Sequence, residues 1–245
     1  MTSKSFADNI RSKIKDDIKQ ERCNEQCYDN CQVDDSGTSH LSIIGEDGSA
    51  VAVTSSINDY FGSKVMSNLT GIIFNNQMND FCKPKKENGQ DKNRSCENNN
   101  LIKPGKRPLS SMCPTIILHS GQVKMVVGGE GGTNITTSVA QHCFTPHAHD
   151  RKQRKRSTVI LNYLFFGYDL QKAVKEPRVQ ITKNETNVEK DFDKVGFLHF
   201  YTLRQIYSVR IVITVQAIVR EGDEVCAESD YRKGGYPAGY PEPIL

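Results

Sequence analysis

Thr38 is the residue whose type and position could do chemistry most directly. It follows the small, flexible segment Asp35-Ser36-Gly37 and opens a run of alternating and β-branched residues, so it stands at the first position of an expected strand. If the bond between Gly37 and Thr38 were cut, Thr38 would present a hydroxyl nucleophile and an α-amine with a pKa of about 8 that can serve as its base. Many threonines begin strands for β propensity alone, so both interpretations stay open here.

A glycine-rich run, Gly128-Gly129-Glu130-Gly131-Gly132, lies between an expected strand and an expected helix start. Backbone N–H groups at such a place can hold an anion or a developing oxyanion. The Gly-x-x-x-x-Gly-Lys-Ser/Thr and Gly-x-Gly-x-x-Gly patterns are both absent, which disfavours a nucleotide-binding loop. A tight turn that needs glycine at positive φ explains the run equally well.

Two loops carry polar groups suited to an amino-acid ligand. Ser110 and Ser111 are adjacent hydroxyls just before a strand, where they could bind a carboxylate, and Asp80 follows amide side chains that together could hold an ammonium group. Taken alone, both segments also read as ordinary turns.

The clusters of cysteine, histidine and basic side chains do not predict a functional site. The four-residue spacing of the first three cysteines lacks a fourth ligand at zinc-like spacing, and the His-rich segment after residue 141 has no ligand pattern, so we expect no metal site in either segment. The basic run at 151–156 has no interleaved aromatic residues and is interpreted as a solvated insert.

Hairpins and helices must position these groups. The sequence predicts a helix and a surface linker within 1–37, a hairpin of 40–44 with 50–54 that begins at residue 38 or 39, and a second hairpin of 114–119 with 123–127. It also predicts a helix over 159–174 that closes before Pro177, and last strands near 211–219 and 225–228. Exposed loops are expected at 83–103 and 142–158. This order predicts an α+β layered domain over 38–245.

Composition restricts the class of protein. The chain has 245 residues and a net charge of +3, which argues against nucleic acid as a partner. Neither a membrane-spanning apolar window nor a secretory signal is evident in it. Eight cysteines and the sequons at the glycosylation candidates Asn68, Asn93 and Asn184 nevertheless fit a secretory compartment, so an exported assembly that contains this chain is one interpretation.

Sequence motifs in a fixed order resemble those of a known family across nearly the whole chain. The resemblance is weakest at 21–33, 83–100, 142–158 and 179–210. The chain resembles the light (small) subunit of γ-glutamyltransferase, also called glutathione hydrolase, in its light-chain-only form. The motifs are Gly37-Thr38-Ser39-His40-Leu41-Ser42, Thr54-Ser55-Ser56-Ile57-Asn58, Asp59-Tyr60-Phe61-Gly62-Ser63, Gly71-Ile72-Ile73-Phe74-Asn75-Asn76-Gln77-Met78, Pro108-Leu109-Ser110-Ser111-Met112, Gly131-Gly132-Thr133-Asn134-Ile135-Thr136-Thr137 and Arg232-Lys233-Gly234-Gly235-Tyr236-Pro237-Ala238-Gly239-Tyr240.

The resemblance implies an N-terminal-nucleophile hydrolase fold, an αββα sandwich of which this chain supplies the small-subunit half. It implies that 1–37 is a tail similar to the end of the family's large subunit, and that self-cleavage between Gly37 and Thr38 removes this tail and leaves Thr38 as the nucleophile of the catalytic light-chain domain 38–245. The other implied roles are Ser56 as the hydroxyl that assists it, Gly131 and Gly132 as the oxyanion hole, Asn58, Gln77 and Asp80 as the ligand and α-amine site, and Ser110 and Ser111 as the α-carboxylate site. Gln77 stands where animal members have glutamate, which should weaken amine recognition without abolishing it.

The implied reaction is hydrolysis or transfer of γ-glutamyl groups from glutathione and its conjugates to water, amino acids or dipeptides, through a γ-glutamyl ester and without a cofactor. The implied partner is a large subunit, which would supply the only membrane attachment and place the site on the extracellular face of the plasma membrane. The alternative is a catalytically silent light-chain-like protein that does not mature without a large subunit.

Overall fold

The computed structural model describes residues 3–13, 37–82, 100–140, 159–181, 185–189, 205–208 and 213–239. Glycosylation candidates Asn93 and Asn184, the segment 142–158 and most of the loop at 83–103 lie outside these ranges. Helix α1 spans Lys4–Lys13, within the helix expected near the start of the chain. No helix in the described ranges is both long and apolar enough to span a membrane.

The first expected hairpin is confirmed as strands β1 (Thr38–Ile44) and β2 (Ala50–Ser56). The strands pair antiparallel with Thr38 opposite Ser56, so the pairing itself brings the two hydroxyl residues together. Along both strands exposed and half-buried side chains alternate, as a two-faced hairpin requires.

The second hairpin and the last strands join into one antiparallel sheet in the order β3-β4-β8-β9. The strands are β3 (Thr115–His119), β4 (Gln122–Glu130), β8 (Thr214–Glu221) and β9 (Glu224–Ser229). Strand β4 is buried without interruption from Met125 to Glu130, because it is covered on both faces.

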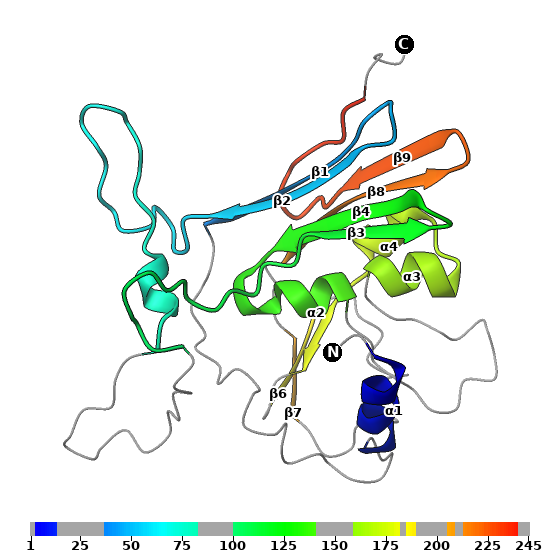
Figure 1. The fold of residues 1–245 in the computed structure, drawn as a ribbon, viewed down its shortest axis with the longest axis horizontal. Coiled ribbons are helices and arrows are strands. Elements are labelled where there is room, and N and C mark those ends of the chain that lie inside the picture. The colour runs from blue at the N-terminus through cyan, green and yellow to red at the C-terminus, as the bar shows by residue number, and fades with distance from the viewer. Residues whose placement is uncertain are drawn as a thin grey trace.

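The described elements form three layers (Figure 1): the β1-β2 hairpin lies on one face of the four-stranded sheet, and helices cover the other. The helices are α2 (Ile135–Ala140), α3 (Val159–Phe166) and α4 (Leu170–Lys175). The hydrophobic core lies between sheet and helices and is built mainly from alternate residues of β4 and β8 together with helix residues: Met125, Val127, Ile135, Val139, Val159, Leu170, Val174, Val215, Ala217 and Val219.

Two expectations about elements need correction, and one sheet was not predicted. The single helix over 159–174 is wrong, because the chain breaks at Gly167, whose φ of +68° is left-handed, and restarts at α4 with Asp169 as its N-cap. The glycine-rich run is not all turn, since Gly128 and Gly129 belong to β4. A third sheet was not foreseen: its strands β5 (Val179–Ile181), β6 (Glu185–Val188) and β7 (Gln205–Ser208) are each only three or four residues long.

Candidate active site

Thr38 lies at the centre of the site. Its side chain is 5% exposed, and its Oγ1 lies 2.8 Å from Ser56 Oγ across the hairpin. The preceding residue is held as firmly: Gly37 N donates to Asn58 O at 2.8 Å, and Gly37 O accepts from Ile57 N at 3.0 Å. Hydrogen bonds therefore hold both the N–H and the carbonyl oxygen of the residue before Thr38.

A chain of hydrogen bonds runs from Ser56 to an acidic group. The backbone N–H of Asn58 donates to Ser56 Oγ at 2.9 Å, and the Asn58 side chain is hydrogen-bonded to Asp80. Gln77 Nε2 donates to Asp80 Oδ2 at 2.7 Å. The structure thus brings five of the predicted site residues into one connected network, although they come from three separate segments of the chain.

The surroundings of Asp80 change the pKa of its carboxyl group. Partial burial raises the pKa of the carboxyl, hydrogen bonds from Gln77 and Asn58 act in the opposite direction, and the nearby charge of Asp59 adds to the increase. A half-buried carboxylate that already accepts amide hydrogen bonds is suited to bind a cationic group such as an ammonium.

Asn58 adopts an unusual backbone conformation at its place in this hydrogen-bond network. Its φ is +74° and its side chain is fully buried. Asparagine tolerates this left-handed conformation better than most residues, and the side chain also approaches Asn76 O at 3.4 Å. The residue type is thus demanded by both the turn and the site.

The predicted carboxylate-binding serines lie on a loop tied to both neighbouring segments. Asn100 donates to Asp80 O at 2.8 Å and accepts from Leu109 N at 3.0 Å, and Thr136 Oγ1 donates to Ser111 O at 3.0 Å. Ser110 is exposed and Ser111 half-buried. Asn100 was missed by sequence reasoning because it ends a stretch of similar asparagines, and nothing in the sequence distinguishes it.

Gly131 and Gly132 form the turn after β4. Their φ values are +127° and +60°, so the glycine requirement of the turn is confirmed. Gly132 begins the short 3-10 helix η3 (Gly132–Asn134), which leads into α2. The turn adjoins the serine loop through the bond between Thr136 and Ser111.

Lys233 is a further residue at this site that sequence reasoning did not assign. Its Nζ donates to Thr38 O at 2.9 Å and to Ser39 Oγ at 3.0 Å, and it forms an ion pair with Glu130, the last residue of β4. Glu130 also accepts a hydrogen bond from Thr214. Lys233 therefore joins the strand of Thr38 to the strand that ends at the glycine turn.

A buried charge network holds the segment that carries Lys233. Asp230, fully buried, accepts from Arg178 at 2.6 Å and from the Arg232 side chain at 2.9 Å. Arg232 also pairs with Glu189 at 2.7 Å. Burial lowers the pKa of Arg178 and the charge of Asp230 opposes that effect.

Comparisons with known proteins agree with this arrangement. A family model described as gamma-glutamyltranspeptidase matches residues 1–240. Glutathione hydrolase 2 of Arabidopsis thaliana is 36% identical over 263 residues, and the match covers 98% of this chain but 42% of the plant protein. The chain thus spans less than half the length of that relative.

Two further matches differ in what they cover. A shorter Arabidopsis thaliana protein named "Putative inactive glutathione hydrolase 4" is 38% identical, over 73% of this chain and 84% of its own length. A solved structure of an acivicin-inhibited gamma-glutamyltranspeptidase matches with a TM-score of 0.64 at 30% sequence identity. That match covers 80% of this chain and 99% of the solved chain.

Proposed function

Because the chain belongs to the gamma-glutamyltranspeptidase family, which has the N-terminal-nucleophile hydrolase fold, we propose that it transfers γ-glutamyl groups from glutathione and related compounds, with Thr38 as the nucleophile. The observation that carries the proposal is the continuous hydrogen-bond chain from Thr38 through Ser56 and Asn58 to Asp80. It links a nucleophilic hydroxyl to a carboxylate that can hold the α-amine of a glutamyl group.

Maturation comes first. Thr38 Oγ attacks the carbonyl carbon of Gly37, the C–N bond to Thr38 breaks as an ester forms, and water hydrolyses the ester to leave a carboxylate on Gly37 and a free amine on Thr38. The hydrogen bonds that fix Gly37 on both sides support this step, since they restrain the carbonyl beside the hydroxyl.

In the mature site the Thr38 amine accepts the hydroxyl proton while Oγ attacks the γ-amide carbon of the substrate. The N–H groups of Gly131 and Gly132 stabilise the oxyanion, Asp80, Gln77 and Asn58 bind the α-amine, and Ser110 and Ser111 bind the α-carboxylate. The proton then passes to the leaving amine of cysteinylglycine. Water or an acceptor amine attacks the γ-glutamyl ester and regenerates Thr38.

A large-subunit partner is part of this proposal. The hairpin turns small and polar residues toward the sheet and exposes an apolar face made of Leu41, Ile43, Val51 and Val53, each 43–56% exposed. An apolar hairpin face of this kind is typical of a surface that a second polypeptide covers. We place the assembly on the extracellular side of the plasma membrane, with glycans at Asn93 and Asn184.

The test is the intact mass and N-terminal residue of the chain, expressed in a secretory host alone and with a large-subunit partner. We expect a new N-terminus at Thr38 in the paired sample, together with release of amine from a γ-glutamyl anilide, and neither in Thr38→Ala. Thr38→Ser, which keeps a hydroxyl, should still mature.

A silent light-chain relative is the second candidate, favoured by the similarity to the shorter plant protein whose name denotes inactivity. If residues 1–37 remain attached in both samples, the amine of Thr38 stays in a peptide bond, and the silent relative replaces the enzyme.

A further inference from the structure

Residues 60–74 form a projecting strip, here called the apolar arm, which stands away from the layered domain (Figure 1). Its two sides are joined by backbone hydrogen bonds from Ser63 N to Phe74 O at 2.8 Å, from Phe74 N to Val65 O at 3.0 Å and from Ser67 N to Ile72 O at 2.9 Å. The apolar arm is therefore a defined structure rather than an irregular loop.

The base of the apolar arm uses strained backbone. Phe61 and Lys64 have φ values of +58° and +60°, although neither is glycine. Gly62 between them has φ +52°, and a β-carbon there would collide with Phe74 O. Backbone strain of this kind persists where the surrounding structure or the function requires it.

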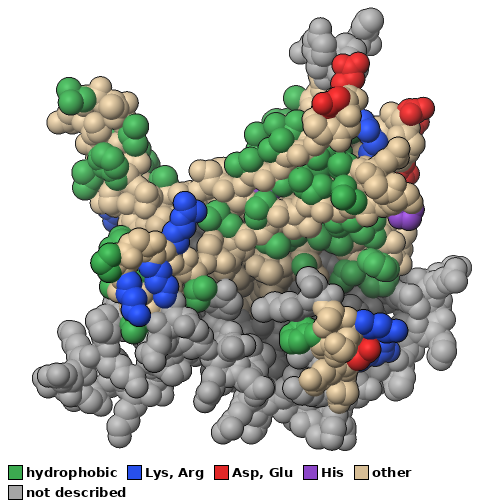
Figure 2. Space-filling view, viewed as in Figure 1, with side chains coloured by type: hydrophobic (Ala, Val, Ile, Leu, Met, Phe, Trp, Pro, Cys, Tyr) green, Lys and Arg blue, Asp and Glu red, His purple; other side chains and the backbone are tan. Residues whose placement is uncertain are grey.

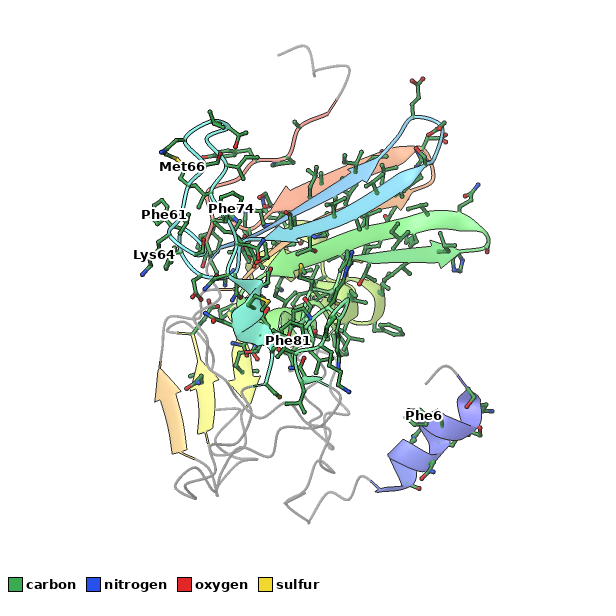
Figure 3. The ribbon with its side chains drawn as sticks, turned by 60° about the vertical axis from the view of Figure 1, so that its left-hand side comes forward. Phe6, Phe61, Lys64, Met66, Phe74 and Phe81 are labelled. Atoms are coloured by element: carbon green, nitrogen blue, oxygen red, sulfur yellow. The ribbon has the colours of Figure 1, made fainter. Side chains whose placement is uncertain are left out.

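The surface of the apolar arm is unusually apolar for a projecting segment. Leu69 at its tip is 98% exposed, and the other exposed large hydrophobic side chains are Tyr60, Phe61, Val65, Met66, Ile72 and Phe74. Lys64 is the one charged residue in the sequence from 60 to 74. Figures 2 and 3 show these side chains gathered on the projection, with Phe61, Met66 and Phe74 along it.

The two ends of the apolar arm enter the proposed amine site directly. Asp59 precedes it and Asn76 follows it, and Asp59 N donates to Asn76 Oδ1 at 3.1 Å. Asn58 Nδ2 approaches Asn76 O, and Gln77 begins the 3-10 helix η1 (Gln77–Asp80) that ends at Asp80. The residues on either side of the apolar arm are therefore hydrogen-bonded to each other, and the same two segments carry Asn58, Gln77 and Asp80.

We propose that the apolar arm inserts into the large-subunit partner and that this contact couples assembly to recognition of the substrate α-amine. The inference rests on the proposed function for the identity of the site. The occupant is a polypeptide that resembles the part of the plant glutathione hydrolase outside its match to this chain, which is more than half of that protein. A single lysine gives the apolar arm little attraction for an anionic membrane, and its apolar side chains match a protein groove.

One consequence concerns Asn68, a glycosylation candidate exposed beside Leu69. A glycan at the tip of the apolar arm and insertion of that tip into a partner exclude one another. We therefore expect Asn68 to be unmodified in the assembled protein, in contrast to Asn93 and Asn184.

The experiment measures association of the full chain with the unmatched part of the plant glutathione hydrolase, co-expressed in a secretory host. Leu69→Ser combined with Ile72→Ser should weaken association at least tenfold without lowering the melting temperature, because both residues are exposed in the free chain. The matched controls Leu118→Ser and Val225→Ser change exposed apolar residues on β3 and β9, 61% and 48% exposed, and should leave association unchanged. Glycosylation at Asn68 in the purified complex would overturn the inference.

Coupling is measured on the assembled protein with two substrates, a γ-glutamyl anilide and a glutaryl anilide, which lacks only the α-amine. The arm variant, assembled at saturating partner, should raise KM several-fold for the first and leave the second unchanged. Equal effects on both substrates, or association that survives the arm substitutions, would refute the inference while leaving Thr38 catalysis intact.

Arm-dependent dimerisation of the chain alone, or arm-dependent binding to phosphatidylcholine vesicles, would also refute it. Absence of anilide release by the unaltered assembly would instead refute the proposed function. The association measurement would still test whether the apolar arm binds the large-subunit partner.

Discussion

At the scale of single residues, the site depends on groups that act through hydrogen bonds from other segments. Thr38 contacts Ser56 through its side chain and Lys233 through its backbone carbonyl. Lys233 also pairs with Glu130, directly before the glycine turn. The ion pair between Lys233 and Glu130 therefore links the strand of the proposed nucleophile to the strand that ends at the proposed oxyanion hole.

Lys233→Met should slow maturation at Thr38 and lower kcat at least tenfold, because the strand of Thr38 and the end of β4 lose their common donor. Glu130→Gln keeps a hydrogen-bond acceptor for Lys233 and Thr214 and should lower kcat less. The measurement is the rate of appearance of the Thr38 N-terminus together with kcat and KM. Equal maturation rates in Lys233→Met and the unaltered chain would show that Lys233 does not position Thr38.

Asp80 should determine the acidic side of the pH profile. Its pKa is raised above the ordinary 3.8, so kcat/KM for a γ-glutamyl anilide should fall as the pH drops through a value above 3.8. For stability the sign is opposite, because the cost of ionising Asp80 in the folded state is complete above the raised folded-state pKa, decreases as the pH falls, and is absent below the ordinary value of 3.8. Asp80→Asn should therefore raise KM at least tenfold at pH 7 without lowering the melting temperature, and a clear loss of stability would contradict this account.

At the scale of elements, the β1-β2 hairpin packs on strands β4 and β8 of the four-stranded sheet, and polar side chains contribute to this packing. His40 lies between Thr54 Oγ1 at 2.8 Å and Ser42 Oγ at 3.0 Å, and Ser42 Oγ reaches Gln216 O on β8 at 3.4 Å. The His40 ring occupies the space where a side chain at Gly128 would stand. A glycine in the middle of β4 thus lets the hairpin approach the sheet closely.

Gly128→Ala should destabilise the fold by about 1–3 kcal/mol, because its β-carbon overlaps the His40 ring. His40→Ala in the same chain should recover part of this loss, which a double-mutant cycle in denaturant unfolding would measure. Gly239→Ala is the matched control, since a β-carbon there meets nothing within 4 Å. Additive effects of the two substitutions would mean that the ring and Gly128 do not meet.

His40 should also make hairpin packing depend on pH. Burial lowers its pKa from 6.5 to about 4, so the neutral ring contributes stability that is complete above 6.5 and is lost as the pH falls through about 4. After allowance for the partial exposure of the ring, the loss is on the order of 1 kcal/mol. Thermal unfolding between pH 7 and 4 should show a shallower decline in His40→Gln, whose side chain stays neutral, and an identical decline would exclude the ring as its source.

At the scale of the whole molecule, one buried network ties the C-terminal segment to the rest of the domain. Arg178 NH2 donates to Val174 O at the end of α4 and to Asp230, and Asp230 also accepts from Val215 N on β8. Arg232 extends the network to Glu189, next to β6. The segment that presents Lys233 to Thr38 is thereby fixed to the four-stranded sheet, to the residue that follows β6 and to helix α4.

Asp230→Ala should destabilise the domain by about 3–5 kcal/mol, because it leaves the Arg178 guanidinium buried without its partner. Maturation at Thr38 should fail in the same variant, since Lys233 loses its support. Lys124→Ala removes an exposed pair with Glu221 and is the control, with an expected change below about 1 kcal/mol. A destabilisation by Asp230→Ala no larger than that of the control would argue against a cooperative network.

The sequence already contained the α+β class, both hairpins and the approximate positions of the last two strands, because alternation and turn residues are short-range signals. The family resemblance, rather than any local pattern, implied Ser56, Asn58 and Gln77 as site residues beside Thr38. Tertiary structure supplied the contacts of Lys233 with Thr38, of Asn100 with Asp80 and of His40 with Gly128. It also supplied the third sheet, whose short strands carry little periodicity, and the break at Gly167. The partner of Lys233 lies 195 positions away in the chain, and no local pattern encodes such a contact, because it arises only when separate elements pack around a shared core.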